Sequence, residues 1–397
     1  MSRLRPLRLF VVAEAQRSGA PIALLRAMTW LVDQGAVEPY FVMRAPGDLL
    51  SEFEALGPVR VVPRRREVRL ASAARSLHLE APYGTAKAAG LGGALRRMAR
   101  AWKTDLVYVN TIVHADTVAL LAPLGLPIVC HVHELARMID RHVSADERAQ
   151  LISQVTTWLA VSPAVVAALS GLGVPEASIE LVPGIVPLPD LPLPDGRAAR
   201  ARMLGGRPAE SAVVAACGSA NWNKGADLFV PLAVALDGQR ARDGAKRPVV
   251  ACWIGTDERE PDGRLMFEDA RASGLGDMLR LLPPGPDASE MLGAADVFVS
   301  TSREDSNPLT VLEAAAAARP VVCFEGSGGA NDLVGAGGGI AVPYLDIGAL
   351  AAAARSLVED PDLAARLGAR ARAYVESHSA AEIVGAHLRD VLRAASA

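Results

Sequence analysis

The sequence contains little of what marks a secreted, zinc-binding or membrane-spanning chain. Its 397 residues include only four cysteines, which are widely separated and lie in short apolar stretches: Cys130, Cys217, Cys252 and Cys323. This spacing gives neither a disulfide framework nor a zinc pattern, so we expect reduced core cysteines in a cytosolic protein. The longest apolar stretch, 117–130, has 14 residues and two prolines. It is too short for a bilayer, which needs roughly 20 apolar residues.

A targeting signal and a large excess of one charge are also missing. Residues 1–8 lead directly into a strand-like run without the small-residue cleavage site of a secretory signal. This favours a cytoplasmic protein whose membrane contact is at most peripheral, at the inner face. The formal net charge is −3 at pH 7, with 51% hydrophobic and 21% charged residues. The balance predicts globular domains and gives no reason to expect a nucleic-acid partner.

Positive charge is nevertheless concentrated in one part of the chain. Residues 60–103 hold eleven Arg or Lys and only two acids, Glu67 and Glu80. Basic faces are commonly just solvated, and that is one interpretation of this segment. The other is that it docks on an anionic membrane surface or on an acidic, diphosphate-linked acceptor.

Short runs rich in Val, Ile and Leu alternate with longer helical patterns along the chain. Seven runs fall between residues 8 and 183, and six more between residues 212 and 343. Continuous apolar strands separated by helices are typical of parallel sheets covered on both faces. A proline-rich segment, 183–196, separates the two sets and is the expected linker.

We therefore expect an α/β protein with two doubly wound, Rossmann-like domains facing across a cleft. The first domain would span residues 1–185 and the second residues 186–378. The last helix, within 379–397, is expected to pack back on the first domain. Ligands of such sheets bind at the carboxyl ends of the strands.

An acidic segment follows the expected strand at 296–300. Residues 301–307 would form the loop at the carboxyl end of this strand, and a helix would begin near Pro308 with Asn307 as its cap. Asp305 would lie in the loop, and Glu313 about one and a half turns into the helix, beside its apolar face. A half-buried carboxylate there needs a hydrogen-bond donor.

Two interpretations of these acids stand side by side. Sugar or ribose hydroxyls would donate to both carboxylates, while free amides at the helix start suit phosphate, which together indicate a nucleotide-sugar site. Alternatively, Asp305 and Glu313 are ordinary acids near a helix N-terminus, where the helix dipole favours negative charge.

Residues 303–322, REDSNPLTVLEAAAAARPVV, resemble the acid-x7-acid signature of family 4 retaining glycosyltransferases of GT-B fold. Further stretches resemble that family in the same order, among them SGAPIALLRAMTWL (18–31), PIVCHVHEL (127–135), CGSANWNKGADLF (217–229) and FEGSGGANDLV (324–334). The resemblance covers nearly the whole chain. It implies an N-terminal domain that takes the acceptor and a C-terminal domain that takes a nucleotide sugar.

The same resemblance implies roles for the acidic segment. Asp305 would contact hydroxyls of the donor sugar, and Glu313 would contact the ribose. The backbone between them would face the sugar and the diphosphate, at Ser306, Asn307, Pro308 and Leu309.

Lys224 is the expected phosphate cation. It follows the strand at 212–218 and would open a helix, where its ammonium can stabilise a departing diphosphate. A plain surface lysine is disfavoured there by the helix dipole. The family pattern has an Arg five residues earlier, where this chain has Ser219. Arg303 is a candidate replacement, and reliance on backbone amides or weak activity are the alternatives.

Two candidate residues come from the first domain. Alternation places His131 and His133 on the same side of the chain. By resemblance, His133 lies beside the donor sugar and supports it by hydrogen bonding rather than as a general base; Glu134 follows it. Asn110, at the end of the matching stretch DLVYVN, is a further expected substrate contact. A two-histidine metal site and a core histidine at a strand end are the alternatives.

Several glycines are weaker candidates. Gly19 lies between the first expected strand and helix, where a missing side chain lets a ligand approach the backbone. Its surroundings lack the G-x-G-x-x-G pattern, which argues against a NAD enzyme. Gly328 and Gly329 fit either a ligand approach or an ordinary turn, and Asp332 stands where the family usually has Glu.

The implied activity is that of a hexosyltransferase that moves a sugar from a nucleoside diphosphate to an acceptor hydroxyl with retention of configuration. No essential metal or other cofactor is expected. The expected acceptor is a surface polysaccharide or lipid-linked glycan, and a small-molecule natural product is the second choice. A GT-B sugar-nucleotide epimerase stays open, as does an inactive nucleotide-sugar-binding subunit, which the missing Arg at position 219 suggests.

Overall fold

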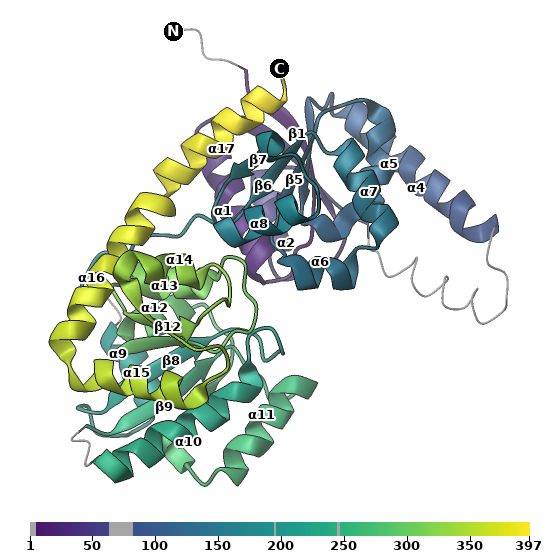
Figure 1. The fold of residues 1–397 in the computed structure, drawn as a ribbon. Helices are drawn as coiled ribbons and strands as arrows, with labels where there is room; N and C mark the ends of the chain where they lie inside the picture. Colours follow the sequence, from purple (N-terminus) through teal and green to yellow (C-terminus); the bar gives the residue numbers. More distant parts are fainter. Residues whose placement is uncertain (1–4, 63–81, 194–195, 244–246) are drawn as a thin grey trace. The chain divides into compact units, whose positions relative to one another are not determined.

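The computed structural model describes residues 5–62, 82–193, 196–243 and 247–397. The chain forms two compact units (Figure 1). Unit 1 comprises Met1–Ile185 and Ala381–Ala397, and unit 2 comprises Val186–Ala380. Residues 63–81 of the basic segment 60–103, which suggested a docking surface, lie outside the described part of the chain.

Unit 1 is built on a seven-stranded parallel sheet in the order β3-β2-β1-β4-β5-β6-β7. The strands are β1 (Leu7–Ala13), β2 (Val37–Met43), β3 (Val59–Val61), β4 (Leu106–Asn110), β5 (Ile128–Val132), β6 (Thr157–Ala160) and β7 (Ile179–Leu181). The helices are α1 (Gly19–Asp33), α2 (Leu50–Leu56), α4 (Pro82–Ala101), α5 (Ala115–Leu121), α6 (Ala136–His142), α7 (Ala145–Gln154), α8 (Pro163–Gly171) and α17 (Ala381–Ala395), with short helices η1 (Ile112–His114), η2 (Ala122–Leu124) and η3 (Glu176–Ser178).

Unit 2 is built on a six-stranded parallel sheet in the order β10-β9-β8-β11-β12-β13. The strands are β8 (Ala212–Cys217), β9 (Val249–Ile254), β10 (Leu279–Leu282), β11 (Val297–Ser300), β12 (Val321–Phe324) and β13 (Gly339–Val342). The helices are α9 (Gly196–Leu204), α10 (Ala226–Asp243), α11 (Pro261–Ala272), α12 (Ala288–Ala294), α13 (Leu309–Ala316), α14 (Ala330–Leu333), α15 (Ile347–Glu359) and α16 (Pro361–His378), with η4 (Gly276–Met278) and η5 (Val334–Gly338).

Both faces of each sheet are buried, which is why the strands are continuous apolar runs. In β1, Leu9 and Val11 belong to the core shared with α1, α2 and α17, while Phe10 and Val12 belong to the core on the opposite face, shared with α4, α5, α7 and α8. In unit 2, residues of β8 pack with α10, α11 and α15 in the same manner. The structure confirms the expected fold class of two Rossmann-like α/β domains.

The strand order of each sheet reverses direction at one point. In unit 1 the chain leaves β1 toward β2 and β3 and then returns to β4 on the other side of β1; in unit 2 the same reversal separates β8 from β11. The loops that follow these strand pairs run in opposite directions, which leaves a crevice at the carboxyl edge where ligands of such sheets bind. Two of the expected site residues lie at these edges: Asn110 at the end of β4 in unit 1, and Lys224 in the loop after β8 in unit 2.

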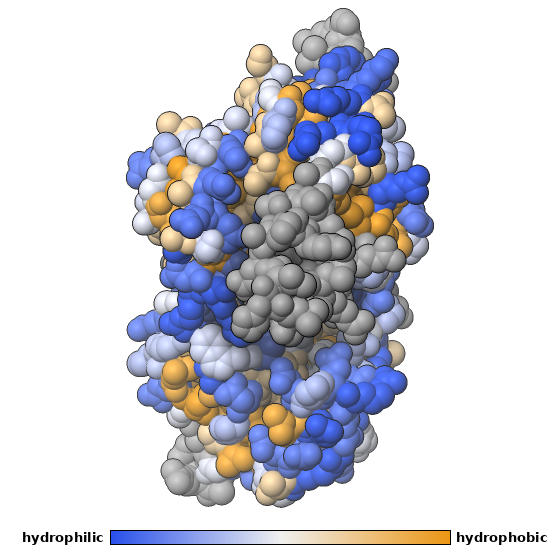
Figure 2. Space-filling view, turned by 90° about the vertical axis from the view of Figure 1, so that its right-hand side faces the viewer, coloured by the Kyte–Doolittle hydropathy of each residue, from blue (hydrophilic) through white to orange (hydrophobic). Residues whose placement is uncertain are grey.

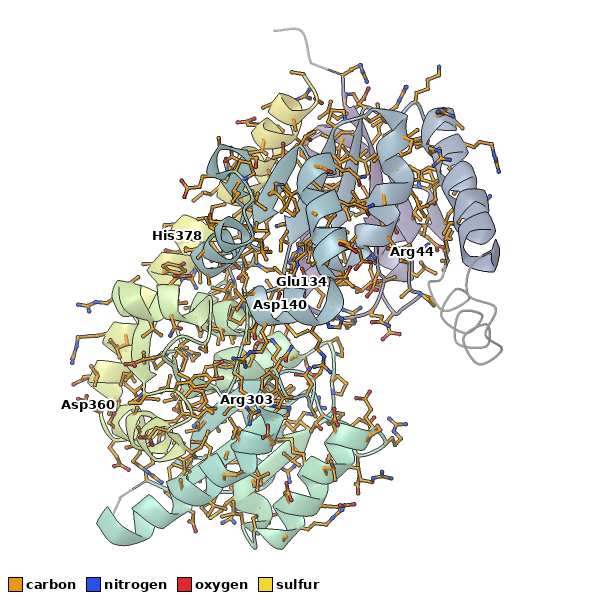
Figure 3. All side chains as sticks on the ribbon, turned by 45° about the vertical axis from the view of Figure 1, so that its right-hand side comes forward. Arg44, Glu134, Asp140, Arg303, Asp360 and His378 are labelled. Atoms are coloured by element: carbon orange, nitrogen blue, oxygen red, sulfur yellow. The ribbon has the colours of Figure 1, made fainter. Side chains whose placement is uncertain are left out.

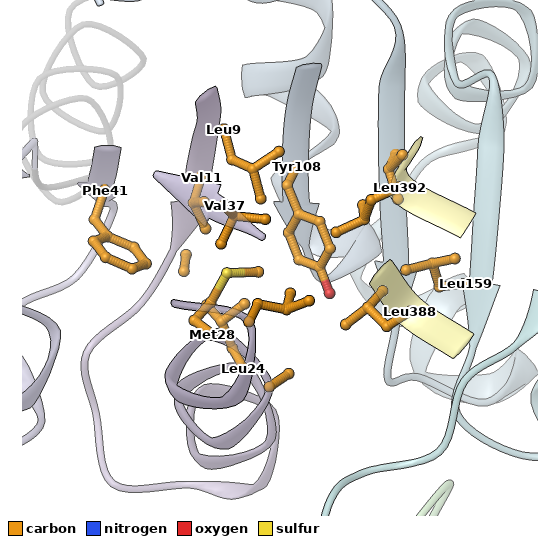
Figure 4. Packing of buried hydrophobic residues seen from close by; sticks show 14 of the residues in the cluster. Leu9, Val11, Leu24, Met28, Val37, Phe41, Tyr108, Leu159, Leu388 and Leu392 are labelled. Carbon is orange, nitrogen blue, oxygen red and sulfur yellow. The ribbon is translucent and has the colours of Figure 1, made fainter. Parts of the chain in front are cut away.

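Helix α17 completes the core of unit 1 although it is the last element of the chain. Its buried side chains, among them Val384, Leu388 and Leu392, belong to the same hydrophobic cluster as Leu9, Val11 and Met28 (Figure 4). Gly385 lies against the indole of Trp30 in α1, so closely that a Cβ there would lie 2.3 Å from the ring. Where the chain enters and leaves unit 2, the Val186 N–H donates to Ser379 O at 2.9 Å.

No helix within the described ranges is long and apolar enough to cross a membrane. On the face drawn in Figure 2, apolar side chains occur in small groups among hydrophilic ones. In the described part of the basic segment, Arg97 and Arg100 are exposed on α4, while Arg96 donates to Leu120 O at 2.7 Å.

Replacing Leu388 by Ala should strongly destabilise unit 1, because this side chain is fully buried in the cluster described above. We expect the free energy of unfolding to fall by about 2–5 kcal/mol, the usual cost of removing a buried leucine side chain. Urea denaturation of the full chain measures it. Ile383→Ala is the matched control, because Ile383 lies on the same helix and is 49% exposed; equal losses in the two variants would contradict the packing described for α17.

Candidate functional site

Three loops at the carboxyl edge of the unit 2 sheet are bonded to one another. The loop after β11 donates hydrogen bonds to both of its neighbours: on one side Arg303 N–H donates to Asn223 O at 2.8 Å, and Thr301 Oγ1 donates to Lys224 O at 2.9 Å. On the other side Asp305 N–H donates to Ser327 O at 2.8 Å, in the loop after β12. These bonds fix the backbone that carries Lys224 and Asp305.

Two glycines make this close packing of loops feasible. Gly225 has φ +63°, and a Cβ there would lie 2.0 Å from Thr301 O. A Cβ on Gly329 would lie 2.4 Å from Ser306 O, and the Gly329 N–H donates to Asp305 O at 3.0 Å. Any side chain at either position would push the loops apart. Gly329 therefore has a structural reason to be glycine, whatever else approaches it.

Lys224 and Asp305 form an ion pair at the point where β8 and β11 diverge. The Lys224 Nζ and Asp305 Oδ2 atoms are in contact, and both side chains are largely buried, 27% and 14% exposed. A small pocket opens beside them, lined by Cys217, Lys224, Thr301, Asp305 and Thr310 among others. The expected cation and the expected sugar-binding acid thus lie together at the topological switch point, where a ligand is expected.

Glu313 lies half-buried on α13, and it faces the end of β8. Ser289 Oγ of α12 lies 3.5 Å from its Oε2, and Thr310, on the preceding turn, donates to Cys217 O at 3.3 Å. Burial raises the pKa of the Cys217 thiol to about 12, and the nearby Glu313 charge adds to the effect. The Asp305 side chain is 14% exposed, and Glu313 is partly exposed to solvent.

Two helix boundaries differ from the expectation. Helix α13 begins at Leu309, and its N-cap position is taken by Pro308, whose ψ of 95° is extended rather than helical; no side chain caps it. Asn307 is therefore not the cap. Lys224 does not open α10, because it lies in a turn two residues before Ala226.

The Arg303 side chain, labelled in Figure 3, is held by two neighbouring residues. Its guanidinium donates to both carboxylate oxygens of Asp227 at 2.7 Å, donates to Trp222 O at 3.0 Å and lies 5.1 Å from the centre of the Trp222 ring. These hydrogen bonds lower the pKa of Asp227. Asp227 thus balances the charge of Arg303, the residue considered as the second phosphate cation. Ser219 is exposed on the same loop as Lys224.

In unit 1 the residues Asn110 and His133 are joined at the switch point of the sheet. Asn110 ends β4 and is 1% exposed. Its Nδ2 donates to Ala20 O at 3.1 Å, in the first turn of α1, and its Oδ1 lies 2.9 Å from His133 Nε2. Gly19 is the exposed first residue of α1, and no protein atom lies within 4 Å of where its Cβ would be.

These bonds determine which nitrogen of His133 carries the proton. A backbone carbonyl only accepts, so the Asn110 atom facing Ala20 must be the amide nitrogen, and the atom facing His133 must be the oxygen. His133 Nε2 therefore donates a proton to Asn110. Burial keeps the pKa of His133 well below 6.5, and the neighbouring His131 lowers it further, so the ring is neutral, with its proton on Nε2.

His131 is fixed by the same logic. Its ring centre lies 4.5 Å from that of His133, as the alternation predicted for their side of the chain. Its Nε2 donates to Val182 O at 3.1 Å, so its Nδ1 accepts from the Tyr108 hydroxyl at 2.6 Å. Burial lowers the pKa of His131 to about 4. Sequence patterns gave no sign of this chain of bonds, because Tyr108 comes from β4 and Val182 from the segment after β7.

A strained residue follows Asn110. Thr111 has φ +116°, which is rare for a β-branched residue and marks a site held by its surroundings. Its hydroxyl donates to the Glu134 carboxylate, and Glu134 also accepts from the His133 N–H at 3.1 Å (Figure 3). Burial raises the pKa of Glu134, and these bonds oppose the rise. Thr111 was not among the expected site residues.

The remaining expected residues of unit 2 lie at or just before the start of α13 and on α14. Ser306 and Asn307 are half-buried between Asp305 and α13, and Pro308 and Leu309 are buried at the helix start. Asp332 lies on α14, and burial raises its pKa. Among the described residues, no three or more His, Cys, Asp or Glu side chains are grouped so as to hold a metal ion.

Both units match known protein families. Residues 202–374 match the family described as "Glycosyl transferases group 1", and residues 19–188 match "Glycosyltransferase Family 4". The chain belongs to the family 4 glycosyltransferases. This confirms the resemblance noted in the sequence.

Individual relatives of this family 4 glycosyltransferase are distant. A D-inositol 3-phosphate glycosyltransferase of Kineococcus radiotolerans is 34% identical over 212 residues, which are 50% of this chain and 48% of the relative. A GDP-mannose-dependent phosphatidylinositol monomannoside mannosyltransferase of Corynebacterium glutamicum is 34% identical over 114 residues, 27% of this chain and 30% of the relative. The chain thus matches less than half the length of these curated relatives.

Solved structures agree on the fold. The crystal structure of Anabaena HepE, determined with UDP-glucose, superposes with a TM-score of 0.78 over 98% of this chain and 100% of that one, at 18% identity. WaaG, a glycosyltransferase of lipopolysaccharide biosynthesis, gives a TM-score of 0.68 at 15% identity over 97% of this chain and 99% of that one. At such identities the likeness concerns the GT-B fold alone.

Nitrogen-15 NMR of the histidines tests the bonding at the unit 1 edge of this family 4 glycosyltransferase. At pH 6 we expect His131 and His133 to be neutral and protonated at Nε2, because burial lowers both pKa values below 6.5. Below about pH 6.5 each histidine would bind a further proton in the unfolded chain but not in the folded one, so the free energy of unfolding falls as pH falls through this range. Asn110→Ala should remove the hydrogen bond that fixes the tautomer of His133, so that both of its tautomers become populated, and should leave the tautomer of His131 unchanged. An imidazolium at either position at pH 6 would contradict the assignment.

Proposed function

We propose that this family 4 glycosyltransferase transfers a sugar from a nucleoside diphosphate to an acceptor hydroxyl, with retention of anomeric configuration. The observation that carries the proposal is the Lys224–Asp305 ion pair beside the pocket at the switch point of the unit 2 sheet. An ammonium for phosphate and a carboxylate for hydroxyls are the two groups that an activated sugar requires. Here they lie in contact on a fixed backbone.

Donor binding would exchange the partners of this pair. The Lys224 ammonium turns to the diphosphate, and the Asp305 carboxylate accepts from sugar hydroxyls. Glu313, on the other side of the pocket residue Thr310, accepts from the ribose diol. Each charged group leaves one charge-assisted bond for another, so the half-buried charges stay compensated when the ligand enters.

The transfer itself needs few protein groups. The bond between the anomeric carbon and the phosphate oxygen breaks while the bond to the acceptor oxygen forms on the same face, and the proton of the acceptor hydroxyl passes to the departing phosphate. Lys224 stabilises the negative charge that develops on that phosphate. His133, neutral and held by Asn110, contributes hydrogen bonding near the sugar and takes no proton in this scheme. No metal or other cofactor is required by it.

The relatives suggest the substrates. The HepE structure was solved with UDP-glucose, and one relative is named as dependent on GDP-mannose. We infer a uridine or guanosine diphosphate hexose as donor. The named acceptors of the relatives are an inositol phosphate and a phosphatidylinositol mannoside, which favours a hydroxyl-rich acceptor, either lipid-linked or part of a cell-surface glycan, reached from the cytoplasmic side. A small-molecule acceptor is the second candidate.

Replacing Glu313 by Ala should reduce kcat/KM for the donor by about 10- to 100-fold, because a charge-assisted hydrogen bond to the ribose is worth about 1.5–3 kcal/mol. Release of nucleoside diphosphate from UDP- and GDP-hexoses measures it, after a thermal-shift screen of nucleotides has chosen the donor. Glu325→Ala, an exposed carboxylate after β12, is the matched control and should retain activity.

Other outcomes would point to other functions. Wild-type turnover in Glu313→Ala would remove this residue from the site. A donor that is isomerised without any acceptor would favour an epimerase. Nucleotide binding without turnover over a broad panel of donors and acceptors would favour a binding subunit, in agreement with the missing arginine at Ser219.

A further inference from the structure

Two exposed aromatic side chains flank Arg303 at the carboxyl edge of the unit 2 sheet. Trp222 is 47% exposed and Tyr344 is 43% exposed. The Arg303 guanidinium lies 5.1 Å from the Trp222 ring centre, and the Tyr344 hydroxyl donates to Arg303 O at 3.4 Å. The Tyr344 ring also meets Phe324 edge-on, with ring centres 6.1 Å apart. We call Trp222 and Tyr344 the aromatic platform.

The Arg303 guanidinium beside the platform is fixed, and its charge is balanced. The bidentate bonds to Asp227, together with the bond to Trp222 O, immobilise the Arg303 guanidinium, whose side chain is only 11% exposed. Asp227 balances the charge of this guanidinium. It leaves two aromatic rings exposed to solvent beside a satisfied ion pair, next to the loops that carry Lys224 and Asp305.

The platform lies next to the reacting groups but away from Glu313. Trp222 precedes Lys224 by two residues, and Arg303 precedes Asp305 by two. Asp227 belongs to α10, which packs with α11 and α15, whereas Glu313 belongs to α13, which packs with α12 and α16. The Lys224–Asp305 pair thus has the platform on its α10 side and Glu313 on its α13 side.

We propose that the aromatic platform binds an uncharged pyranose ring, namely a sugar ring of the acceptor. The inference rests on the proposed function, because it takes the ribose to lie at Glu313 and the transferred sugar at Asp305. A nucleotide placed in this way extends toward the α13 side. The platform is then available to the acceptor, to which the sugar is transferred. Pyranose rings have an apolar C–H face that is attracted to the electron-rich face of indole and phenol rings.

This assignment predicts the chemical class of the acceptor. A sugar ring stacked on Trp222 and Tyr344 would present a hydroxyl toward the Lys224–Asp305 pair. The enzyme should therefore prefer glycosides over acyclic polyols of similar size. Part of the acceptor would then be selected by unit 2, which the sequence pattern had assigned to the donor alone.

Titration with methyl α-D-glucopyranoside and methyl α-D-mannopyranoside, followed by saturation-transfer difference NMR, tests the platform without requiring turnover. We expect binding to the wild-type chain, about tenfold weaker Kd in Trp222→Ala and about twofold weaker Kd in Trp222→Phe, because the smaller ring keeps part of the stacking surface. Tyr344→Ala should weaken binding as well. Leu265→Ala, a 58% exposed side chain on α11, is the matched control and should leave Kd unchanged.

The outcomes separate the two proposals. Unchanged glycoside affinity in Trp222→Ala, or no glycoside binding to the wild-type chain, would overturn the platform. A thermal shift with UDP measured on the same samples reports on the donor site, and we expect it to be equal in all variants. Absence of that shift with UDP and GDP in the wild-type chain would count against the proposed function and leave the glycoside titration to decide the platform.

Discussion

The ion pair of Lys224 and Asp305 constrains the rest of unit 2. It joins loops that are 81 residues apart in the chain. Both charges are mostly withdrawn from water, so each needs the other residue as partner, or a ligand group that takes that residue's place. The backbone around it is fixed from both sides by bonds to Asn223 and Ser327. Glycine at 225 and 329 is what allows the loops to approach so closely. The site is thus already formed in the fold and does not need a ligand to assemble it.

The corresponding edge of unit 1 follows a different physical principle. There the two histidines are uncharged, and their protons are assigned by carbonyl groups that can only accept. Such a network loses little when it is buried, because every bond is satisfied without separating charge. The strained Thr111 and its bond to Glu134 hold the loop that follows Asn110.

Sequence patterns were sufficient for the architecture. The apolar runs predicted the strands of both sheets because a strand buried on both faces cannot alternate, and the acid-x7-acid stretch led to the family. They also grouped Asp305, Lys224 and Glu313 in one unit. What they could not give were partners fixed by tertiary packing: Asp227 for Arg303, Tyr108 for His131, and Lys224 for Asp305 itself. The cap at Pro308 was missed because a proline there fits either the cap or the first helical position.

The central claim is that the Lys224–Asp305 pair opens to hold a nucleoside diphosphate and its sugar. A crystal structure of the chain with UDP or GDP bound tests it most directly. The account predicts a phosphate oxygen within hydrogen-bond distance of Lys224 Nζ, the ribose hydroxyls on Glu313, and Asp305 released toward the position of the sugar. A nucleotide bound elsewhere, with the ion pair of Lys224 and Asp305 unbroken and Glu313 without contact to it, would contradict the account.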